Sequence, residues 1–93
     1  MQATFDFSGR VVIVTGSTKG LGRAMVDGFA RSGAKVVVSS RKQDLCDQVA
    51  SELRAAHDAE VLPLACHVGD WEAIPGFVDS VMERFGRIDV LVN

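Results

Sequence analysis

Four short apolar runs recur at similar intervals along the chain. They occupy residues 11–14, 36–39, 61–64 and 88–92, and the first reads Val-Val-Ile-Val. Within them apolar residues largely follow one another instead of alternating with polar ones, which is typical of strands covered on both faces. Longer segments of mixed polarity separate the runs. The pattern predicts four strands that alternate with helices, as in α/β proteins with a parallel sheet.

The intervening segments carry apolar residues at helical spacing. One has Leu45, Val49, Leu53 and Ala56, and the next has Ile74, Phe77, Val78, Val81 and Phe85. Each set predicts the buried face of a helix that packs on the sheet. We expect an earlier helix to bury Met25, Val26 and Phe29. It should end at Ser32-Gly33, because glycine suits the left-handed conformation that often terminates a helix.

A glycine-rich turn follows the first predicted strand directly. Residues 15–22 read Thr-Gly-Ser-Thr-Lys-Gly-Leu-Gly. Glycine is needed where a backbone turns tightly, adopts positive φ or approaches a ligand closely. The free N–H groups and the positive dipole end of the helix that follows suit an anion such as a dinucleotide pyrophosphate. The binding candidates in this turn are Gly16, Ser17, Thr18, Lys19, Gly20, Leu21 and Gly22.

The glycine spacing distinguishes this turn from other phosphate-binding motifs. A P-loop requires Gly-Lys followed by Ser or Thr, whereas Lys19 is followed by Gly20. The general Gly-x-Gly-x-x-Gly fingerprint of dinucleotide-binding folds is not matched letter for letter, although its mechanics apply to the Gly-x-x-x-Gly-x-Gly variant found here. The alternative is a strand-to-helix turn whose glycines serve tight packing only.

The variant Thr-Gly-x-x-x-Gly-x-Gly after a first strand resembles the short-chain dehydrogenase/reductase family. Phe7-Ser8-Gly9-Arg10 is similar to the usual lead-in of that family, and Val90-Leu91-Val92-Asn93 is similar to the start of its Asn-Asn-Ala-Gly segment. The resemblance extends over essentially the whole chain, but only over the amino-terminal part of a typical member. It implies an NAD(P)-dependent oxidoreductase that transfers hydride between its cofactor and a small alcohol or carbonyl substrate.

We expect one dinucleotide-binding domain over residues 1–93. Its fold should be a Rossmann-type doubly wound parallel sheet with the spatial strand order 3-2-1-4. Such sheets arise from right-handed crossovers, and their ligands bind at the carboxyl ends of the strands where the strand order reverses. The glycine turn then faces a crevice beside the fourth strand. Asn93 ends that strand and is expected on the other wall of the crevice.

The end of the second strand bears on the choice of cofactor. An NAD site places an Asp or Glu here to bind the ribose 2′-hydroxyl, but this chain has Ser40 and Arg41. The guanidinium of Arg41 suits a phosphate, and Lys19 resembles the phosphate-contacting base of NADP-preferring family members. We therefore expect NADP(H) to be preferred over NAD(H). The alternative is that Lys19, Arg41 and Lys42 are ordinary surface charges.

The segment after the third strand resembles the family segment that contacts adenine. That segment often carries Asp-Val where this chain has His67 and Val68. A histidine can bond to the adenine edge or stack on the ring, so both residues are candidates. A partly buried His67 bonded to the backbone is an equal alternative. Asp70 is expected to cap a helix that contains Trp71 and Glu72.

The resemblance places the family's catalytic residues elsewhere. Its catalytic Ser, its Tyr-x-x-x-Lys pair and its substrate-binding segments lie beyond the part that this chain resembles, and the chain has no tyrosine. We assign no catalytic residue and expect nucleotide binding without catalysis by the chain alone. Homo-oligomers are common in the family, which makes a second copy a candidate partner. A non-catalytic nucleotide-binding or interaction module is the alternative, and it would need to protect the apolar fourth strand.

Composition and charge narrow the classes of partner. The 93 residues carry a net charge of -2 and 47% hydrophobic residues, so we expect no general attraction to nucleic acid or anionic membranes. No apolar span or signal-type amino terminus is recognised, which indicates a cytoplasmic location. Cys46, Cys66, His57 and His67 lack the paired spacing of a zinc site. We expect free thiols and a solvated or helix-end His57.

Overall fold

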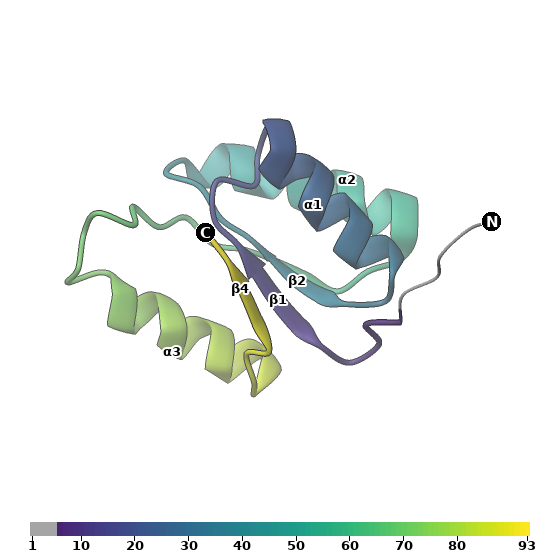
Figure 1. The fold of residues 1–93 in the computed structure, drawn as a ribbon. Helices are drawn as coiled ribbons and strands as arrows, with labels where there is room; N and C mark the ends of the chain where they lie inside the picture. Colours follow the sequence, from purple (N-terminus) through teal and green to yellow (C-terminus); the bar gives the residue numbers. More distant parts are fainter. Residues whose placement is uncertain (1–5) are drawn as a thin grey trace.

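Strands and helices alternate along the part of the chain that the computed structural model describes, residues 6–93. The expected domain begins at residue 1, so its first five residues lie outside that range. The elements are β1 (Val11–Val14), α1 (Gly20–Arg31), β2 (Lys35–Val38), α2 (Gln43–His57), β3 (Val61–Pro63), α3 (Ile74–Phe85) and β4 (Val90–Val92), as Figure 1 shows. Over residues 6–93, none of the helices combines the length and apolar character needed to cross a membrane.

The four strands form one parallel sheet in the order β3-β2-β1-β4. β1 is an interior strand, with Val12 opposite Val36 of β2 on one side and opposite Val90 of β4 on the other. β2 pairs in turn with β3, where Val36 lies opposite Val61. The predicted doubly wound fold and strand order are confirmed.

Side chains at the strand ends shift the strand boundaries slightly from the predicted ones. β2 starts one residue early, at Lys35, and it ends one residue early because the N–H of Ser39 bonds to the side chain of Ser17 (2.9 Å) instead of continuing the ladder. β3 ends at Pro63, one residue before its predicted end. β4 starts two residues late, because the carboxylate of Asp89 accepts the N–H of Val11 (2.8 Å). Side-chain hydrogen bonds therefore replace part of the ladder.

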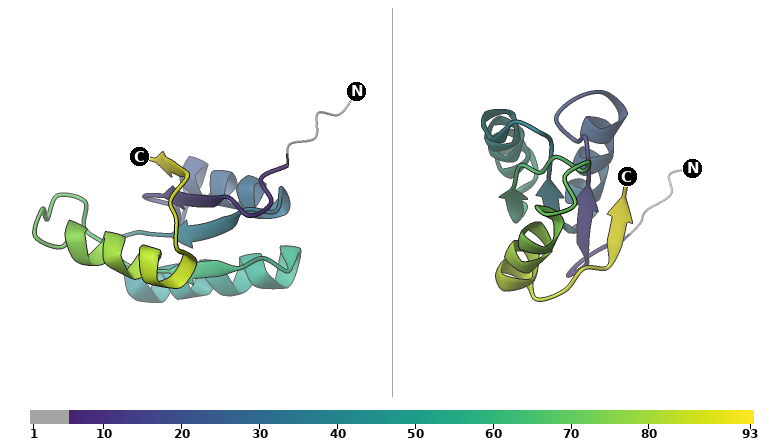
Figure 2. Two further views of the ribbon diagram at one scale, coloured as in Figure 1. Left: turned by 90° about the horizontal axis from the view of Figure 1, so that it is seen from below. Right: turned by 90° about the vertical axis from the view of Figure 1, so that its left-hand side faces the viewer.

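Helices cover both faces of the sheet. α1 and α2 lie against one face and α3 lies against the other (Figure 1 and Figure 2). Along β1, Val12 and Val14 belong to the core under α1 and α2, whereas Val11 and Ile13 belong to the core under α3. All four side chains are at most 3% exposed. Successive residues of one strand thus enter opposite cores, which explains the continuous apolar runs.

α1 packs and ends as predicted. Val26 is fully buried, and Met25 and Phe29 are partly buried against the same core. Phe7 adds an edge-to-face contact, with its ring centroid 5.2 Å from that of Phe29. Gly33 follows the helix with φ +94°, a conformation that favours glycine.

The buried face of α2 is rotated from the predicted one. Leu45 is 39% exposed, and Ala56 is exposed. The buried positions are Cys46, Val49, Ala50 and Leu53. They follow the spacing i, i+3, i+4 and i+7, and small residues at two of them hid the pattern in the sequence. On α3, Val81 is buried as predicted, but Val78 is 37% exposed.

A polar cluster joins α1 to α2 outside the core. Nε2 of His57, at the end of α2, donates to Oδ1 of Asp27 on α1 at 2.9 Å. Arg23 lies 3.7 Å from Asp27 and 3.3 Å from Glu52. His57 is therefore a helix-end residue as expected. Its side chain is only 17% exposed, so it ties two helices together and is not a solvated residue.

β4 forms one edge of the sheet. Among the described strands it pairs only with β1, and Leu91 is 63% exposed. Val90 and Val92 pack partly against the core under α1 and α2. Exposed apolar strand edges are features that proteins usually pair or cover. The described residues leave this edge open to solvent.

Replacing Leu53 with alanine should destabilise the fold by about 2–5 kcal/mol, because the side chain is fully buried between α2 and the sheet. Leu45→Ala on the same helix should cost less, since Leu45 is 39% exposed. The free energies of unfolding in urea compare the two variants. Equal losses would contradict the observed rotation of the buried face.

Asp27→Asn should lower stability at neutral pH and lose this effect in acid. The hydrogen bond from His57 lowers the pKa of Asp27, with smaller contributions from the charges of His57, Arg23 and Arg31, while partial burial opposes them. A lowered folded-state pKa stabilises the fold above the unfolded pKa, about 3.9, and the contribution is lost as pH falls through the folded pKa. Urea unfolding at pH 7 and pH 3 tests this.

The matched control is Asp79→Asn on α3, because the side chain of Asp79 is exposed and makes no hydrogen bond or ion pair within residues 6–93. Its stability should stay within about 0.5 kcal/mol of the parent at both pH values. A difference between Asp27→Asn and the parent that persists unchanged at pH 3 would sink the interpretation.

Candidate cofactor-binding site

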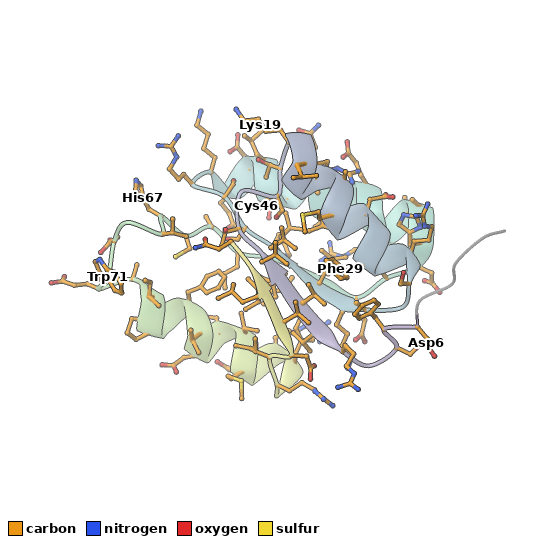
Figure 3. All side chains as sticks on the ribbon, viewed as in Figure 1. Asp6, Lys19, Phe29, Cys46, His67 and Trp71 are labelled. Atoms are coloured by element: carbon orange, nitrogen blue, oxygen red, sulfur yellow. The ribbon has the colours of Figure 1, made fainter. Side chains whose placement is uncertain are left out.

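A cleft opens at the carboxyl ends of the strands. Its volume is about 550 Å³, within the range of small-molecule sites. The lining residues are Thr15, Gly16, Thr18, Lys19, Ser40, Arg41, Lys42, Leu45, Cys66, His67, Val68 and Asn93. In Figure 3, Lys19 and His67 lie at this end of the molecule, and Asp6 lies at the far end. The cleft is therefore where doubly wound sheets bind their ligands.

Most of the predicted binding residues meet in this cleft. They are Gly16, Thr18, Lys19, Ser40, Arg41, His67, Val68 and Asn93. Ser17, Gly20, Leu21 and Gly22 do not line it. Thr15, Lys42, Leu45 and Cys66 also line the cleft, although the sequence does not predict them as binding residues. Three of them directly adjoin predicted positions, which is the signal that could identify them, whereas Leu45 belongs to a predicted buried helix face.

The glycines of the turn serve two different purposes. Gly16 and Gly20 each have φ +61°, and a Cβ on either would meet no atom within 4 Å. Gly22 instead lies against the turn, where a Cβ would collide with the carbonyl oxygen of Gly16. Tight packing thus accounts for Gly22 alone. Gly16 and Gly20 combine positive φ with open space, which is what close approach of a ligand to the backbone requires.

The amino terminus of α1 lies beside the cleft without a side-chain cap. Lys19 is the N-cap residue, with an extended backbone (φ -155°), and its side chain makes no capping hydrogen bond. The first N–H groups of a helix have no intrahelical acceptor, and they carry the positive end of the helix dipole. The turn and the helix together therefore favour an anion.

Ser17 holds the glycine turn against the end of β2 and does not face the cleft. Its Oγ accepts the N–H of Ser39 at 2.9 Å and lies 3.3 Å from the carbonyl oxygen of Ser39. The N–H of Ser17 donates to the same carbonyl at 3.0 Å. Ser17 is 0% exposed. The sequence predicts that Ser17 binds the cofactor directly, but in the structure it supports the turn from behind. Leu21, by contrast, is 78% exposed at the start of α1.

Three cations and no carboxylate line the cleft. Lys19 comes from the glycine turn, and Arg41 and Lys42 come from the turn after β2. None of the three forms an ion pair within the described residues. Nearby charges of one sign raise the local attraction for an opposite charge in a concave site. The cleft is therefore locally cationic although the whole chain carries a net charge of -2.

Ser40 organises the turn that carries Arg41. Its Oγ accepts the N–H of Lys42 at 3.2 Å and lies 3.3 Å from Sγ of Cys46. Cys46 is buried, Cys66 is half-buried, and both thiols are free. Within residues 6–93, no three side chains of the metal-ligating types come together.

The segment after β3 forms a further wall of the cleft. The exposed His67 accepts the N–H of Gly69 through Nδ1 at 3.2 Å, so it bonds to the backbone and also borders the cleft. Val68 is 53% exposed. Asp70 accepts the N–H of Glu72 at 3.1 Å. The prediction that Asp70 caps a helix containing Trp71 and Glu72 is wrong, because Asp70 closes a turn and the helix begins only at Ile74.

Asn93 joins β4 to the start of the glycine turn. Its Oδ1 accepts the hydroxyl proton of Thr15 at 2.9 Å, and the N–H of Thr15 donates to the carbonyl of Val92 at 3.0 Å. The threonine that opens the glycine motif therefore fixes the motif to β4. This role explains why Thr15 lines the cleft together with Asn93.

Gly22→Ala should destabilise the chain by about 1–3 kcal/mol, because the new Cβ has to displace backbone at Gly16. Gly28→Ala is the matched control on the same helix, since a Cβ there meets nothing within 4 Å. It should stabilise the helix by about 0.5–1 kcal/mol. Urea unfolding measures both changes, and a neutral Gly22→Ala would contradict the observed close packing.

The comparisons with known proteins agree on one family. The family described as short chain dehydrogenase matches residues 10–93. Tropinone reductase-like 3 of Erythroxylum coca is 40% identical over 87 residues, which cover 94% of this chain and 33% of that protein. The chain thus spans about a third of the length of the curated relatives that it matches.

Solved structures give the same result. L-sorbose reductase of Gluconobacter frateurii, complexed with NADPH and L-sorbose, has a TM-score of 0.90 and 38% identity over 95% of this chain and 34% of that one. A 3-ketoacyl-(acyl-carrier-protein) reductase of Brucella melitensis, complexed with NADH, has a TM-score of 0.83 and 31% identity over 92% and 34%. Sequence motif, strand order and these likenesses agree, and the chain belongs to the short-chain dehydrogenase/reductase family of oxidoreductases.

Proposed function

We propose that this chain is the NADP(H)-binding part of an oxidoreductase that transfers hydride between NADP(H) and a small alcohol or carbonyl compound. Membership of the family supports the reaction class. The cationic cleft at the carboxyl ends of the strands supports the choice of nucleotide. The alternative of a non-catalytic module has no comparable support.

The residues beside the cleft fit a dinucleotide pyrophosphate. Gly16 and Gly20 leave space that a Cβ would fill, and the amino terminus of α1 offers uncapped N–H groups. In this proposal the backbone from Gly16 to Gly22 holds the pyrophosphate. Leu21, which is 78% exposed, provides apolar contact beside it. Ser17 holds the turn in place through Ser39.

The absence of any carboxylate among the cleft residues carries the preference for NADP(H). A carboxylate at the end of the second strand would bind a free 2′-hydroxyl and repel a 2′-phosphate. The side chains present there are Ser40, Arg41 and Lys42, with Lys19 on the facing turn. Arg41 supplies a planar set of donors, and the lysines supply charge. His67 and Val68 border the space proposed for the adenine ring.

The bound nicotinamide would supply the hydride chemistry, while this chain would bind and orient the nucleotide. Asn93 and Thr15 lie at the end of the cleft nearest β4, where they fix the wall beside the glycine turn. The chain has no tyrosine, and we assign none of its residues as a proton donor. In this proposal, substrate binding and proton transfer depend on residues that correspond to the part of the relatives outside the matched region.

Calorimetric titration of the chain with NADPH and NADH tests the proposal. NADPH should bind more tightly than NADH. Arg41→Ala should weaken the binding of NADPH by about tenfold or more and change the binding of NADH little, because only NADPH carries the 2′-phosphate. Arg31→Ala is the control, since Arg31 is an exposed arginine at the other end of α1.

Each contrary outcome has a distinct meaning. If Arg41→Ala weakened the binding of both nucleotides equally, Arg41 would not be the residue that binds the 2′-phosphate. Failure of a folded parent chain to bind either nucleotide would overturn the proposed function and favour an interaction module.

A further inference from the structure

The side chain of Gln43 forms a hydrogen-bonded bridge between two parts of the chain. Gln43 is the first residue of α2. Its Oε1 accepts the N–H of Ala65 at 2.8 Å, and its Nε2 donates to the carbonyl oxygen of Pro63 at 3.0 Å. Nε2 also donates to Oδ1 of Asp47 at 2.9 Å. Both ends of one carboxamide are therefore engaged with the backbone at the end of β3.

The bridge lies on the outer side of an edge strand. β3 pairs only with β2 in the described sheet. Beyond the strand, the N–H of Leu64 donates to the carbonyl of Val38 at 2.9 Å, and the N–H of Cys66 donates to the carbonyl of Ser40 at 2.8 Å. The N–H of Ala65, which lies between them, donates to Oε1 of Gln43. The segment is thus held on its inner side by the end of β2 and on its outer side by α2.

The two ends of the bridge adjoin the two walls of the cleft. Gln43 directly follows Arg41 and Lys42, which carry the cationic wall. Ala65 directly precedes Cys66, His67 and Val68, which line another part of the same cleft. Gln43 itself does not line the cleft. A rigid link of this kind fixes the separation of two binding surfaces without touching the ligand, and preorganisation of that kind raises affinity.

We propose that Gln43 is a positioning residue for the adenosine end of the nucleotide. This inference rests on the proposed function. Together with the backbone hydrogen bond from Cys66 to Ser40, the carboxamide sets the separation between the turn that carries Arg41 and the segment that carries His67. Without it, the outer side of the segment after β3 loses two hydrogen bonds, and both walls move more freely.

The test compares Gln43→Ala and Gln43→Glu with the parent chain. The glutamate keeps an acceptor for the N–H of Ala65, but it loses the donor and faces the carbonyl of Pro63 and the carboxylate of Asp47. It should therefore be at least as harmful as alanine. Gln48→Ala is the matched control, because the side chain of Gln48 is exposed on the same helix and makes no hydrogen bond within residues 6–93.

Two ligands and one measurement without ligand give the readout. Calorimetry with NADPH and with adenosine 2′,5′-bisphosphate, which contains only the adenosine end, should show the same loss of about three- to tenfold for Gln43→Ala. In the chain without nucleotide, NMR hydrogen exchange at the N–H of Ala65 should accelerate by a similar factor, whereas Gln48→Ala changes neither quantity.

The outcomes separate this inference from the proposed function. If the parent binds NADPH and Gln43→Ala binds both ligands with parental affinity, the positioning role is overturned, even where the midpoint of thermal unfolding falls. Unchanged exchange at Ala65 would overturn the bridge itself without any nucleotide. A parent chain that binds neither ligand would overturn the proposed function and, with it, the role assigned to Gln43.

Discussion

The parallel pairing of β1 on both sides is the constraint on which the rest of the structure depends. Its four residues, Val11–Val14, are almost fully buried, with alternate side chains in two separate cores. Burial on both faces requires helices on both faces, and parallel partners require a crossover helix between successive strands. All four strands therefore end at the same edge of the sheet, and the cleft is found there.

Short hydrogen bonds between neighbouring strand ends turn this edge into a defined surface. The glycine turn after β1 is held to the end of β2 by Ser17 and Ser39, and to the end of β4 by Thr15 and Asn93. On the far side, α2 reaches the end of β3 through Gln43. Each link uses a polar side chain where the regular ladder stops. The loops of the site are thus tied to the sheet by side chains from neighbouring segments.

The distribution of charge separates the cleft from the rest of the surface. Outside the cleft several cations pair with carboxylates, as in Arg23–Glu52, Lys35–Glu60 and Arg87–Asp89. In the described residues the three cations of the cleft have no such partner. Exposed ion pairs contribute little to stability. The unpaired cations of the cleft therefore affect the binding of anions more than the stability of the fold.

The sequence by itself determined the architecture, because features that repeat along the chain are local. Continuous apolar runs specify strands buried on both faces, and the glycine spacing specifies the turn after β1. The predicted strand order and most of the cleft residues follow from these signals and from the rules of parallel sheets. The family resemblance rested on the same motifs.

Tertiary structure alone decided which partner each side chain meets. The buried face of α2 includes Cys46 and Ala50, small residues whose burial depends on how closely the helix approaches the sheet. Ser17 turned out to support the glycine turn, and Gln43 to bridge to the segment after β3. These contacts join residues that are 20 or more positions apart. Sequence periodicity reports the period of one element, whereas such contacts are set by how two elements lie against each other in space.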